Sequence, residues 1–253
     1  MIFSLTWRFL LLFGGLTAGV VLFFSGHPFL GILVHAVIVT YSLAGTLNPS
    51  SRLFGKIQTD CQDHIWLTLD DGPDPEDTPA ILDLLDQFQA KATFFVIGKK
   101  AEIYPELIRE IHSRGHQIGN HSQHHPHSTF WSLGPIRAYR EITECQQTIK
   151  KITGTAPTLF RAPVGHFNMF IHPVLKRENL RLIGWNSRGF DGVSASLPLV
   201  SARIRQSMGP GSIVLAHEGT PIAKEVVADI LAHAAANNWQ IKLPDASRQS
   251  GNY

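Results

Sequence analysis

The sequence predicts an α/β domain built on a parallel β-sheet, preceded by two apolar helices that form a hairpin in a membrane. Two observations carry this prediction. Residues 9–51 contain no Asp, Glu, Lys or Arg, whereas the chain from Arg52 onward has the composition of a soluble domain. In that second part short apolar runs alternate with helical patterns, which is typical of a parallel sheet with helices outside it, either open or closed into a barrel.

The N-terminal region contains two apolar runs, Phe9–Phe24 and Phe29–Gly45, separated by the short turn Ser-Gly-His-Pro. Each run is slightly shorter than the roughly 20 residues that span a bilayer core, but apolar neighbours extend both. We therefore expect a transmembrane hairpin at 1–48. A secretory signal peptide in the first run is the alternative, but no small-x-small cleavage site follows Phe24 and a second run comes directly after it.

Positive charges flank the hairpin at its two ends. Arg8 lies before the first run, and Arg52 and Lys56 follow the second, while the turn 25–28 has no Lys or Arg. By the positive-inside rule, both ends and the domain that follows are expected on the cytoplasmic face of the membrane. A signal anchor with a single span would reverse this orientation.

The remainder is divided into a linker at 49–64, an α/β domain at 65–245 and a tail at 246–253. Within the domain, five apolar runs have the length and the β-branched or aromatic content of buried strands. They are 65–69, 92–98, 181–185, 212–217 and 239–243. Two helices are predicted where a threonine is followed by proline at the first helical position, at 79–88 and 221–235.

Composition narrows the classes of function. The chain has 253 residues with 22 Lys and Arg against 20 Asp and Glu, a balance that gives no indication of a nucleic-acid partner. Two cysteines are too few for a disulfide framework or a thiolate metal site. Thirteen histidines are more informative, because several are clustered.

Two carboxylates, Asp70 and Asp71, stand side by side where the strand predicted at 65–69 ends and Gly72-Pro73 forces a turn. A lone Asp-Gly is usually an Asx turn. A pair of like charges becomes favourable when one carboxylate binds a cation and the other transfers protons, because the cation offsets their repulsion and the two environments separate their pKa values. The pair therefore predicts a metal site at the end of this strand.

The segment Gly119–His127, with the sequence GNHSQHHPH, contains candidate metal ligands. His121 and His125 are four residues apart, which on one helical turn places both imidazoles on the same face. Two histidines and a carboxylate form a common three-ligand catalytic site with an open position. His124 and His127 are competing ligands that fall off this face. A polar loop whose histidines only meet solvent is the alternative interpretation.

Three later segments place further polar side chains near predicted strand ends. They are FRAPVGHFN at 160–168, GWNSRGFDG at 184–192 and IVLAHEG at 213–219, which contain Arg161, Asp191 and His217. Each is weak by itself, since an arginine is usually solvated or ion-paired and an Asp before Gly is usually a turn. Their order along the chain is the informative feature.

In this order the motifs resemble those of the polysaccharide deacetylases, the NodB-homology family of carbohydrate esterases. TLDDGPD is similar to the first family motif, HSQHH to its His-Ser/Thr-x-x-His motif, RAPVG to its Arg-x-Pro motif, and LAH to its closing Leu-x-His motif. The resemblance covers about 65–243. It implies a distorted (β/α) barrel of about seven strands, fewer than in the eight-stranded form.

The resemblance also implies a metal and a base. Asp71, His121 and His125 would bind one divalent cation, usually Zn²⁺, with Co²⁺, Ni²⁺ and Mn²⁺ as alternatives. Asp70 would be the general base that takes a proton from the attacking water, and Arg161 would pair with it and fix its orientation.

The other implied roles concern the acyl group and the leaving group. The backbone N–H of Val164, which follows Pro163, would stabilise the oxyanion, and Leu215 of the closing motif would line the substrate site. His217, held in its charged form by Asp191, would protonate the leaving amine. The chain departs from the family where Val164 replaces an aromatic residue and where Asp191-Gly192 replaces Asp-Trp, so a wall of the acyl pocket is expected to be missing.

The leading hypothesis is a membrane-anchored, metal-dependent hydrolase that removes N-acetyl groups from amino-sugar units of a poly-, oligo- or lipid-linked saccharide. Within the same chemistry, a deformylase or other deacylase of a lipid-linked amino sugar is the second hypothesis, because a hairpin in the bilayer would hold the domain near such a substrate. A non-catalytic carbohydrate-binding protein on the same fold is the third. The presence of Asp70 and His217 beside the three presumed ligands argues against it.

Overall fold

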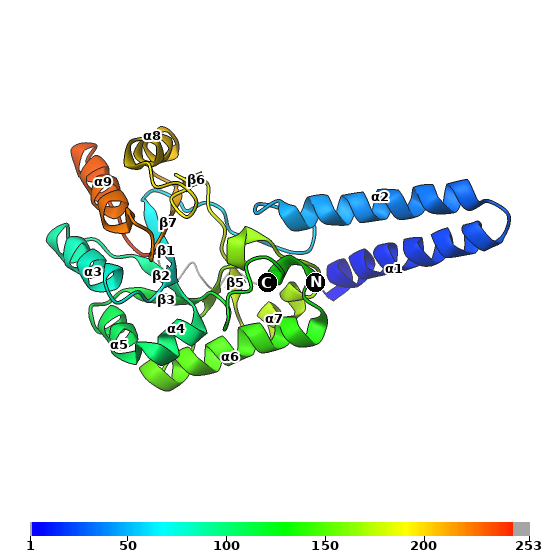
Figure 1. The fold of residues 1–253 in the computed structure, drawn as a ribbon, viewed down its shortest axis with the longest axis horizontal. Coiled ribbons are helices and arrows are strands. Elements are labelled where there is room, and N and C mark those ends of the chain that lie inside the picture. The colour runs from blue at the N-terminus through cyan, green and yellow to red at the C-terminus, as the bar shows by residue number, and fades with distance from the viewer. Residues whose placement is uncertain (1, 245–253) are drawn as a thin grey trace.

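The computed structural model describes the backbone of residues 2–244 and the side chains of residues 10–244, so the tail predicted at 246–253 lies outside the described residues. A curved sheet of seven strands lies at the centre of the domain, in the order β5-β4-β3-β2-β1-β7-β6 (Figure 1). All neighbouring strands are parallel. The strands are β1 (Trp66–Gly72), β2 (Thr93–Val96), β3 (Gln117–Asn120), β4 (Leu159–Phe160), β5 (Arg181–Leu182), β6 (Ser187–Arg188) and β7 (Ile213–His217).

Helices precede the sheet and surround it, and this arrangement confirms the predicted α/β architecture with a parallel sheet. Figure 1 shows the first two helices projecting from the domain and the others placed around the sheet. The helices are α1 (Ile2–Phe24), α2 (Pro28–Leu47), α3 (Asp77–Gln87), α4 (Gly98–Ile103), α5 (Pro105–Ser113), α6 (Pro135–Thr153), α7 (Ile171–Arg177), α8 (Leu197–Ser207) and α9 (Ala223–Ala236), with 3₁₀ turns η1 (Phe130–Ser132) and η2 (Pro163–Gly165).

The residues between α2 and β1 pack along the open side of the curved sheet. The Gln58 N–H donates to the Leu182 carbonyl at 3.0 Å, and the Gly184 N–H donates to the Gln58 carbonyl at 2.7 Å. Three residues further on, the Cys61 N–H donates to the Gly211 carbonyl at 2.9 Å, just before β7. This segment therefore occupies part of the gap between the edge strands β5 and β6, which do not pair with each other.

Several of the predicted elements differ from the structure. The strand predicted at 181–185 is limited to Arg181–Leu182, and the helix predicted at 79–88 begins two residues earlier, at Asp77. The strand predicted at 239–243 is wrong, because only Ile241 forms a bridge, with Ile65. The chain leaves α9 through Asn238 in the left-handed conformation, with φ 57°. Pro244 has no N–H to donate to a neighbouring strand, so the segment between these two residues is too short for a regular β-ladder. The helix predicted at 221–235 begins two residues later, at Ala223, because Pro221 belongs to the preceding turn.

The core of the domain has two main parts. One packs the apolar faces of α3, α5 and α9 against β1, β2 and β7, with Leu67, Phe94 and Val227 among its fully buried side chains. The other gathers Phe160 and Phe167 around the loops that follow η1 and β4. The second part lies directly beneath the loop with the Arg-Ala-Pro motif, which it holds in place.

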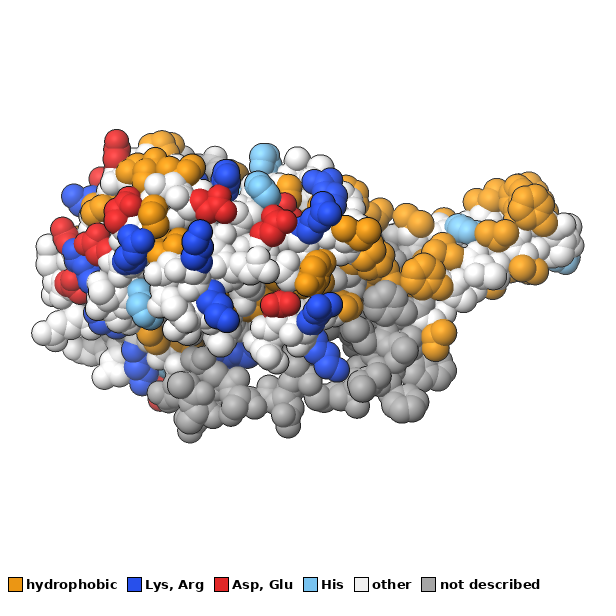
Figure 2. Space-filling view, turned by 90° about the horizontal axis from the view of Figure 1, so that it is seen from below, with side chains coloured by type: hydrophobic (Ala, Val, Ile, Leu, Met, Phe, Trp, Pro, Cys, Tyr) orange, Lys and Arg blue, Asp and Glu red, His pale blue; other side chains and the backbone are white. Residues whose placement is uncertain are grey.

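The two N-terminal helices pack against each other in an antiparallel pair. A Cβ atom at Gly31 would lie 2.6 Å from the Gly19 carbonyl oxygen, so glycine is required for this close approach. The outward side chains of the pair are large and apolar, for example Phe24 and Phe29, which are more than four-fifths exposed. Figure 2 shows these hydrophobic side chains along the projecting hairpin, whereas charged side chains are distributed over the domain.

Among the residues whose side chains are described, Pro28–Leu47 is the one helix that is long and apolar enough to cross a membrane. The part of α1 whose side chains are described, Leu10–Phe24, is apolar but shorter.

Candidate metal centre and catalytic site

Asp70 and Asp71 lie at the carboxyl end of β1, in the mouth of the curved sheet. Asp70 is 3% exposed and is in register with His217 on the neighbouring strand β7. At Asp71 the backbone enters the left-handed region, with φ 70°. The two adjacent carboxylates consequently have different partners, Arg161 for Asp70 and His125 for Asp71.

His121 and His125 lie in the loop that directly follows β3, and the expectation that they share a helical turn is wrong. Ser122 and His125 have φ values of 67° and 50°, so the chain turns through the left-handed region twice. The Asn120 side-chain oxygen accepts from the Ser122 N–H at 2.9 Å, and the Ser122 hydroxyl oxygen accepts from the His125 N–H at 3.1 Å. These local hydrogen bonds bring the two imidazoles together, with ring centroids 4.8 Å apart.

Asp71, His121 and His125 converge on one point. Nε2 of His125 and Nε2 of His121 lie 3.1 and 3.4 Å from Asp71 Oδ1, and one potential ligand atom from each residue lies within 4.8 Å of the others. The competing histidines are elsewhere. The exposed His124 is paired with Glu141 at 3.0 Å, and the exposed His127 stacks on the outer side of His125.

The donor set fits a divalent cation. Asp71 Oδ1 is buried and has no hydrogen-bonding partner among the described residues, although two imidazole nitrogens face it. Nδ1 of His121 lies 2.8 Å from the Arg161 carbonyl oxygen, which fixes the tautomer and directs Nε2 toward Asp71. Two imidazoles and one carboxylate are the ligands of many catalytic zinc sites.

The protonation states agree with this fit. Burial alone would raise the pKa of the Asp71 carboxyl, but the adjacent imidazoles, foremost that of His121, lower it well below its usual range. Burial lowers the pKa of His125 to about 4, so this imidazole is neutral. Burial would also lower the pKa of His121, yet the negative charges of Asp70 and Asp71 raise it. The centre thus favours positive charge between its carboxylates, which a cation would supply.

Arg161 is fully buried and holds Asp70 in place. Its Nη1 donates to Asp70 Oδ1 at 2.8 Å and to the Thr68 hydroxyl at 2.7 Å, and its Nη2 donates to the Gly184 carbonyl at 2.9 Å. The guanidinium also lies over the Phe95 ring, 4.3 Å from its centroid. With one oxygen held by Arg161, the other oxygen of Asp70 lies on the side of the metal cluster, 3.7 Å from His121 Nε2.

His217 and Asp191 form a second pair on the other side of Asp70. Asp191 accepts from the His217 backbone N–H at 2.7 Å, and its other oxygen lies 3.0 Å from His217 Nδ1. Although burial would lower the pKa of His217, the hydrogen bond and charge of Asp191, with smaller contributions from Asp70 and Asp71, raise it to about 9. Gly192 lies beside the imidazole ring. Because Nδ1 is held by Asp191, Nε2 carries the proton available to a substrate.

This pair gives a prediction for the pH dependence of activity. The role of general acid expected for His217 requires a protonated imidazole, so its contribution would be present below its pKa and lost as pH rises through that value, about 9. In Asp191→Asn the raising interaction is removed, and we expect the alkaline limb of the kcat/KM profile to move down toward the ordinary value of 6.5. Initial rates measured between about pH 6 and 10 provide the test.

Asp83→Asn, a change at an exposed carboxylate paired with Arg114, is the matched control and should leave the profile unchanged. An Asp191→Asn profile identical to that of the unaltered protein would show that Asp191 does not set the pKa of the general acid.

The remaining predicted substrate residues differ in exposure. Val164, in η2 after β4, is 49% exposed and adopts the left-handed conformation with φ 58°, while Pro163 before it is buried. Leu215 is almost completely buried within β7, two residues before His217 and therefore on the same face of the strand. Five of the eight non-glycine residues with positive φ in the described chain belong to the site or its loops, which is typical of functional loops held under strain. They are Asp71, Ser122, His125, Val164 and Phe190.

Three residues that were not predicted from the sequence contact the site residues or their backbone and help to hold them in position. Thr68 accepts from Arg161 and donates to the Val214 carbonyl at 2.7 Å. Lys100 Nζ donates to the Asp71 carbonyl at 2.7 Å. Glu218 is buried directly after His217, accepts from the Thr78 hydroxyl and fills the space beside Gly72, and burial raises its pKa to about 8. Nothing in the sequence motifs next to these three residues indicates their contacts, because the contacts form only when distant parts of the chain fold together.

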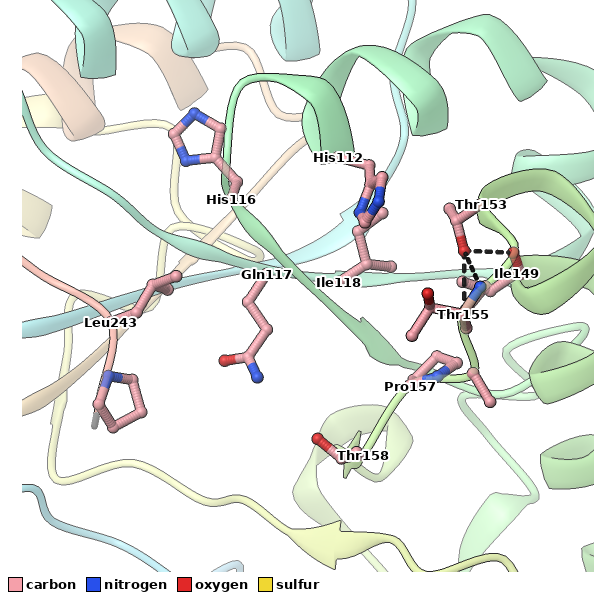
Figure 3. A pocket seen from close by; sticks show the side chains of 12 residues that line it. His112, His116, Gln117, Ile118, Ile149, Thr153, Thr155, Pro157, Thr158 and Leu243 are labelled. Carbon is pink, nitrogen blue, oxygen red and sulfur yellow. Dashed lines mark hydrogen bonds between the residues drawn. The ribbon is translucent and has the colours of Figure 1, made fainter. Parts of the chain in front are cut away.

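A cavity of about 350 Å³ lies elsewhere, at the amino end of β3 (Figure 3). His112, His116 and Gln117 are among the residues that line it, beside the last turn of α6. Burial lowers the pKa of His116 to about 4. The predicted site residues do not line this cavity, so its position is separate from the metal cluster at the opposite end of the strands.

Comparison with known proteins places these side chains in context. A family model described as polysaccharide deacetylase matches residues 57–183, which include the first three motifs. A peptidoglycan-N-acetylglucosamine deacetylase from Bacillus cereus is 33% identical over 153 residues, which are 60% of this chain and 55% of that protein. This chain thus spans about half the length of that relative.

Two further proteins are similar over more of their length. A chitooligosaccharide deacetylase from Azorhizobium caulinodans is 33% identical over 173 residues, which cover 68% of this chain and 81% of the relative. The structure of the peptidoglycan deacetylase PdaC from Bacillus subtilis matches with a TM-score of 0.67 at 30% identity, over 74% of this chain and 90% of that structure.

Proposed function

Because the chain belongs to the polysaccharide deacetylase family, we propose that it is a metal-dependent hydrolase that removes N-acetyl groups from the amino-sugar units of a saccharide. The observation that carries this proposal is the position of the buried Asp70, between the cluster of Asp71, His121 and His125 on one side and His217 on the other. The relatives, described as deacetylases of peptidoglycan and of chitooligosaccharides, support the same substrate class.

The cluster would hold one divalent cation, with zinc the best match to its nitrogen and oxygen donors. When bound, the cation would supply Lewis acidity toward water and toward the acyl oxygen. Asp70 Oδ2 would take the proton from the attacking water, since Arg161 holds its other oxygen and prevents the carboxylate from turning away. Val164 would contribute its backbone N–H to the developing oxyanion.

His217 would complete the reaction from the other side of the scissile amide. Its Nε2 would give a proton to the leaving amine, while Asp191 holds Nδ1 and favours the charged imidazolium before transfer. The products would be a carboxylate and a free amino sugar. In this scheme the two adjacent aspartates have separate roles, because Asp71 is a ligand and Asp70 a base.

Acyl release from defined substrates tests this function. Full-length protein, purified in detergent and loaded with a divalent metal, would be incubated with N-acetylglucosamine oligomers and with the corresponding N-formyl compounds. We expect acetate release with a matching loss of mass from the sugar. Formate release in preference to acetate would assign the deformylase alternative. Binding of oligomers without release of either acid would favour the non-catalytic alternative and contradict the proposal.

We further propose that α1 and α2 anchor the domain in a membrane, with the domain on the cytoplasmic face. The apolar exterior of the hairpin and the helix at Pro28–Leu47 support anchoring, and the positive charges at Arg8, Arg52 and Lys56 support this orientation.

The orientation gives a prediction for reporter fusions. A fluorescent protein fused after Tyr253 is expected to fluoresce and alkaline phosphatase fused there to be inactive, because the positive ends of the hairpin stay in the cytoplasm. Fusions in the turn 25–28 are the matched control and should give the opposite pattern. Active phosphatase after Tyr253 with a silent fluorescent fusion would place the domain outside.

A further inference from the structure

A cavity of about 740 Å³ lies at the root of the helical hairpin, within the range of about 300–1,000 Å³ that is usual for ligand sites. It is formed between α1, α2 and residues 51–54. Its lining is mainly apolar, with Leu12, Ile38 and Leu53 on different sides of the space. A cavity of this kind suits a hydrocarbon chain better than a sugar, because the lining offers few groups that could pair with hydroxyls.

The lining includes one charged residue, Arg52, and the aromatic residue Tyr41. Both are exposed, and Arg52 follows the end of α2 by five residues. This is the level at which a lipid headgroup lies when a helix of this kind spans a bilayer. A guanidinium in that position complements the phosphate of an anionic lipid.

Residues that line the cavity also pack toward the loop that carries part of the catalytic site. Leu12 and Leu53 pack against the same apolar cluster as Phe160 and Phe167, which flank the Arg-Ala-Pro motif. Pro49, at the end of the hairpin, lies so close to Gly165 that a Cβ atom there would be 2.9 Å from it. The packing between the cavity and the loop that contains Val164 is therefore contiguous.

The rim of the catalytic site is also apolar. Val164, Phe190 and Val193 are 49%, 41% and 87% exposed, and all three belong to loops that carry predicted site residues. Arg188 lies over the Phe190 ring, 4.0 Å from its centroid, so a cation accompanies this apolar surface. A rim of this composition favours a substrate that has both a lipid part and an anionic group.

We propose that this cavity binds the hydrocarbon chain of a lipid-linked substrate, an N-acylated amino sugar carried on a lipid phosphate, with the phosphate at Arg52 and the sugar in the catalytic site. This inference rests on the proposed deacylase function and specifies its substrate class. The hairpin is then part of the substrate-binding site in addition to an anchor.

The test uses the full-length protein in detergent micelles and three probes. They are N-acetylglucosaminyl phosphate esterified to a long alkyl chain, the same sugar phosphate with a methyl ester, and an N-acetylglucosamine oligomer. Acyl release and equilibrium binding of a fluorescent long-chain form are measured separately. We expect the long-chain substrate to have the highest kcat/KM, by at least about tenfold, a gain that burial of about two CH₂ groups would supply.

Two variants act on the cavity and two matched controls act beside it. Ala44→Trp fills the cavity from an exposed position of α2, whereas Leu43→Trp makes the same change at a neighbouring position that does not line it. Arg52→Gln removes the cation, whereas Lys56→Gln removes an exposed charge outside the cavity. Ala44→Trp should lose the preference for the long chain over the methyl ester and bind the fluorescent lipid about tenfold more weakly. Arg52→Gln should lower kcat/KM for both phosphate esters about tenfold relative to that for the oligomer. The controls should behave as the unaltered protein.

The outcomes separate this inference from the function on which it rests. Turnover of the oligomer and of the methyl ester at the same rate as the long-chain substrate would overturn the inference and leave the deacetylase function intact. Equal effects of Ala44→Trp and Leu43→Trp would also overturn it. Phosphatidylglycerol and the unlabelled long-chain substrate would each be tested as competitors of the fluorescent substrate. If phosphatidylglycerol competes equally well, the cavity is a site for membrane lipid and the inference is overturned. Tight, cavity-dependent binding with no acyl release from any probe would contradict the proposed function.

Discussion

Asp70→Asn is expected to lower kcat by at least about a hundredfold while the protein keeps its divalent metal, because general-base catalysis contributes about 10²–10⁴. The amide has the size of the carboxylate but cannot take a proton. Arg161, fully buried, would lose its charged partner in this variant, and breaking a buried pair costs about 3–5 kcal/mol. Metal content, kcat and the thermal unfolding midpoint should therefore be measured on the same preparation.

Asp71→Asn is the informative comparison for that result. It changes the neighbouring carboxylate in the same way, yet we expect it to lower metal affinity, because Asp71 faces both imidazoles. Added metal should restore activity to Asp71→Asn in part and should have no effect on Asp70→Asn. Equal metal affinity in the two variants would show that the assigned roles of base and ligand are wrong.

Removal of either histidine ligand is expected to abolish most metal binding and, with it, activity. The unaltered full-length protein should contain about one equivalent of divalent metal per chain by elemental analysis. His125→Ala and His121→Gln should lose most of it, since three protein ligands are the minimum set of such a catalytic site. Glutamine is preferred at His121 because that side chain is 1% exposed and alanine would leave a cavity.

His124→Ala is the matched control for these variants. This histidine belongs to the same loop but is exposed and paired with Glu141, so its removal should leave the metal content unchanged. Full metal content in both His125→Ala and His121→Gln would exclude the cluster as the metal centre. Reconstitution with zinc, cobalt, nickel or manganese would then rank the metals by activity.

The longest strands of the sheet could be predicted from the sequence, and of the two-residue strands only β5 lies in a predicted run, 181–185. β1 and β7 are runs of five to seven residues with clear apolar content, so their positions follow from composition. β4 and β6 have two residues each, too few for any periodicity to be visible. β3 reads Gln-Ile-Gly-Asn, and its glycine is present because a side chain there would collide with the Phe95 ring. Such a contact between two strands has no local signal.

The chemistry of the site was accessible from residue types and spacing, whereas its geometry was not. His121 and His125 were identified as candidate ligands from their types and spacing, the family resemblance implied Asp71 as the third, and the structure brings the three together. The path between the two histidines was predicted as a helical turn, but left-handed residues and an Asn side chain form it instead. Those conformations depend on hydrogen bonds within the folded loop, which sequence spacing does not determine.

The segment after α2 packs against the domain and so restricts the movement of the domain relative to the two helices. α2 ends at Leu47, and by Pro49 the chain already lies against Gly165 of the domain, so no flexible tether separates the helices from the catalytic mouth. With the helices in a bilayer, the active centre would stay at a fixed height and angle above the surface. The lipid-linked substrate proposed above would then reach the active centre mainly by lateral diffusion within the membrane. The number of substrate molecules per unit area, more than their concentration in solution, would set the rate of encounter.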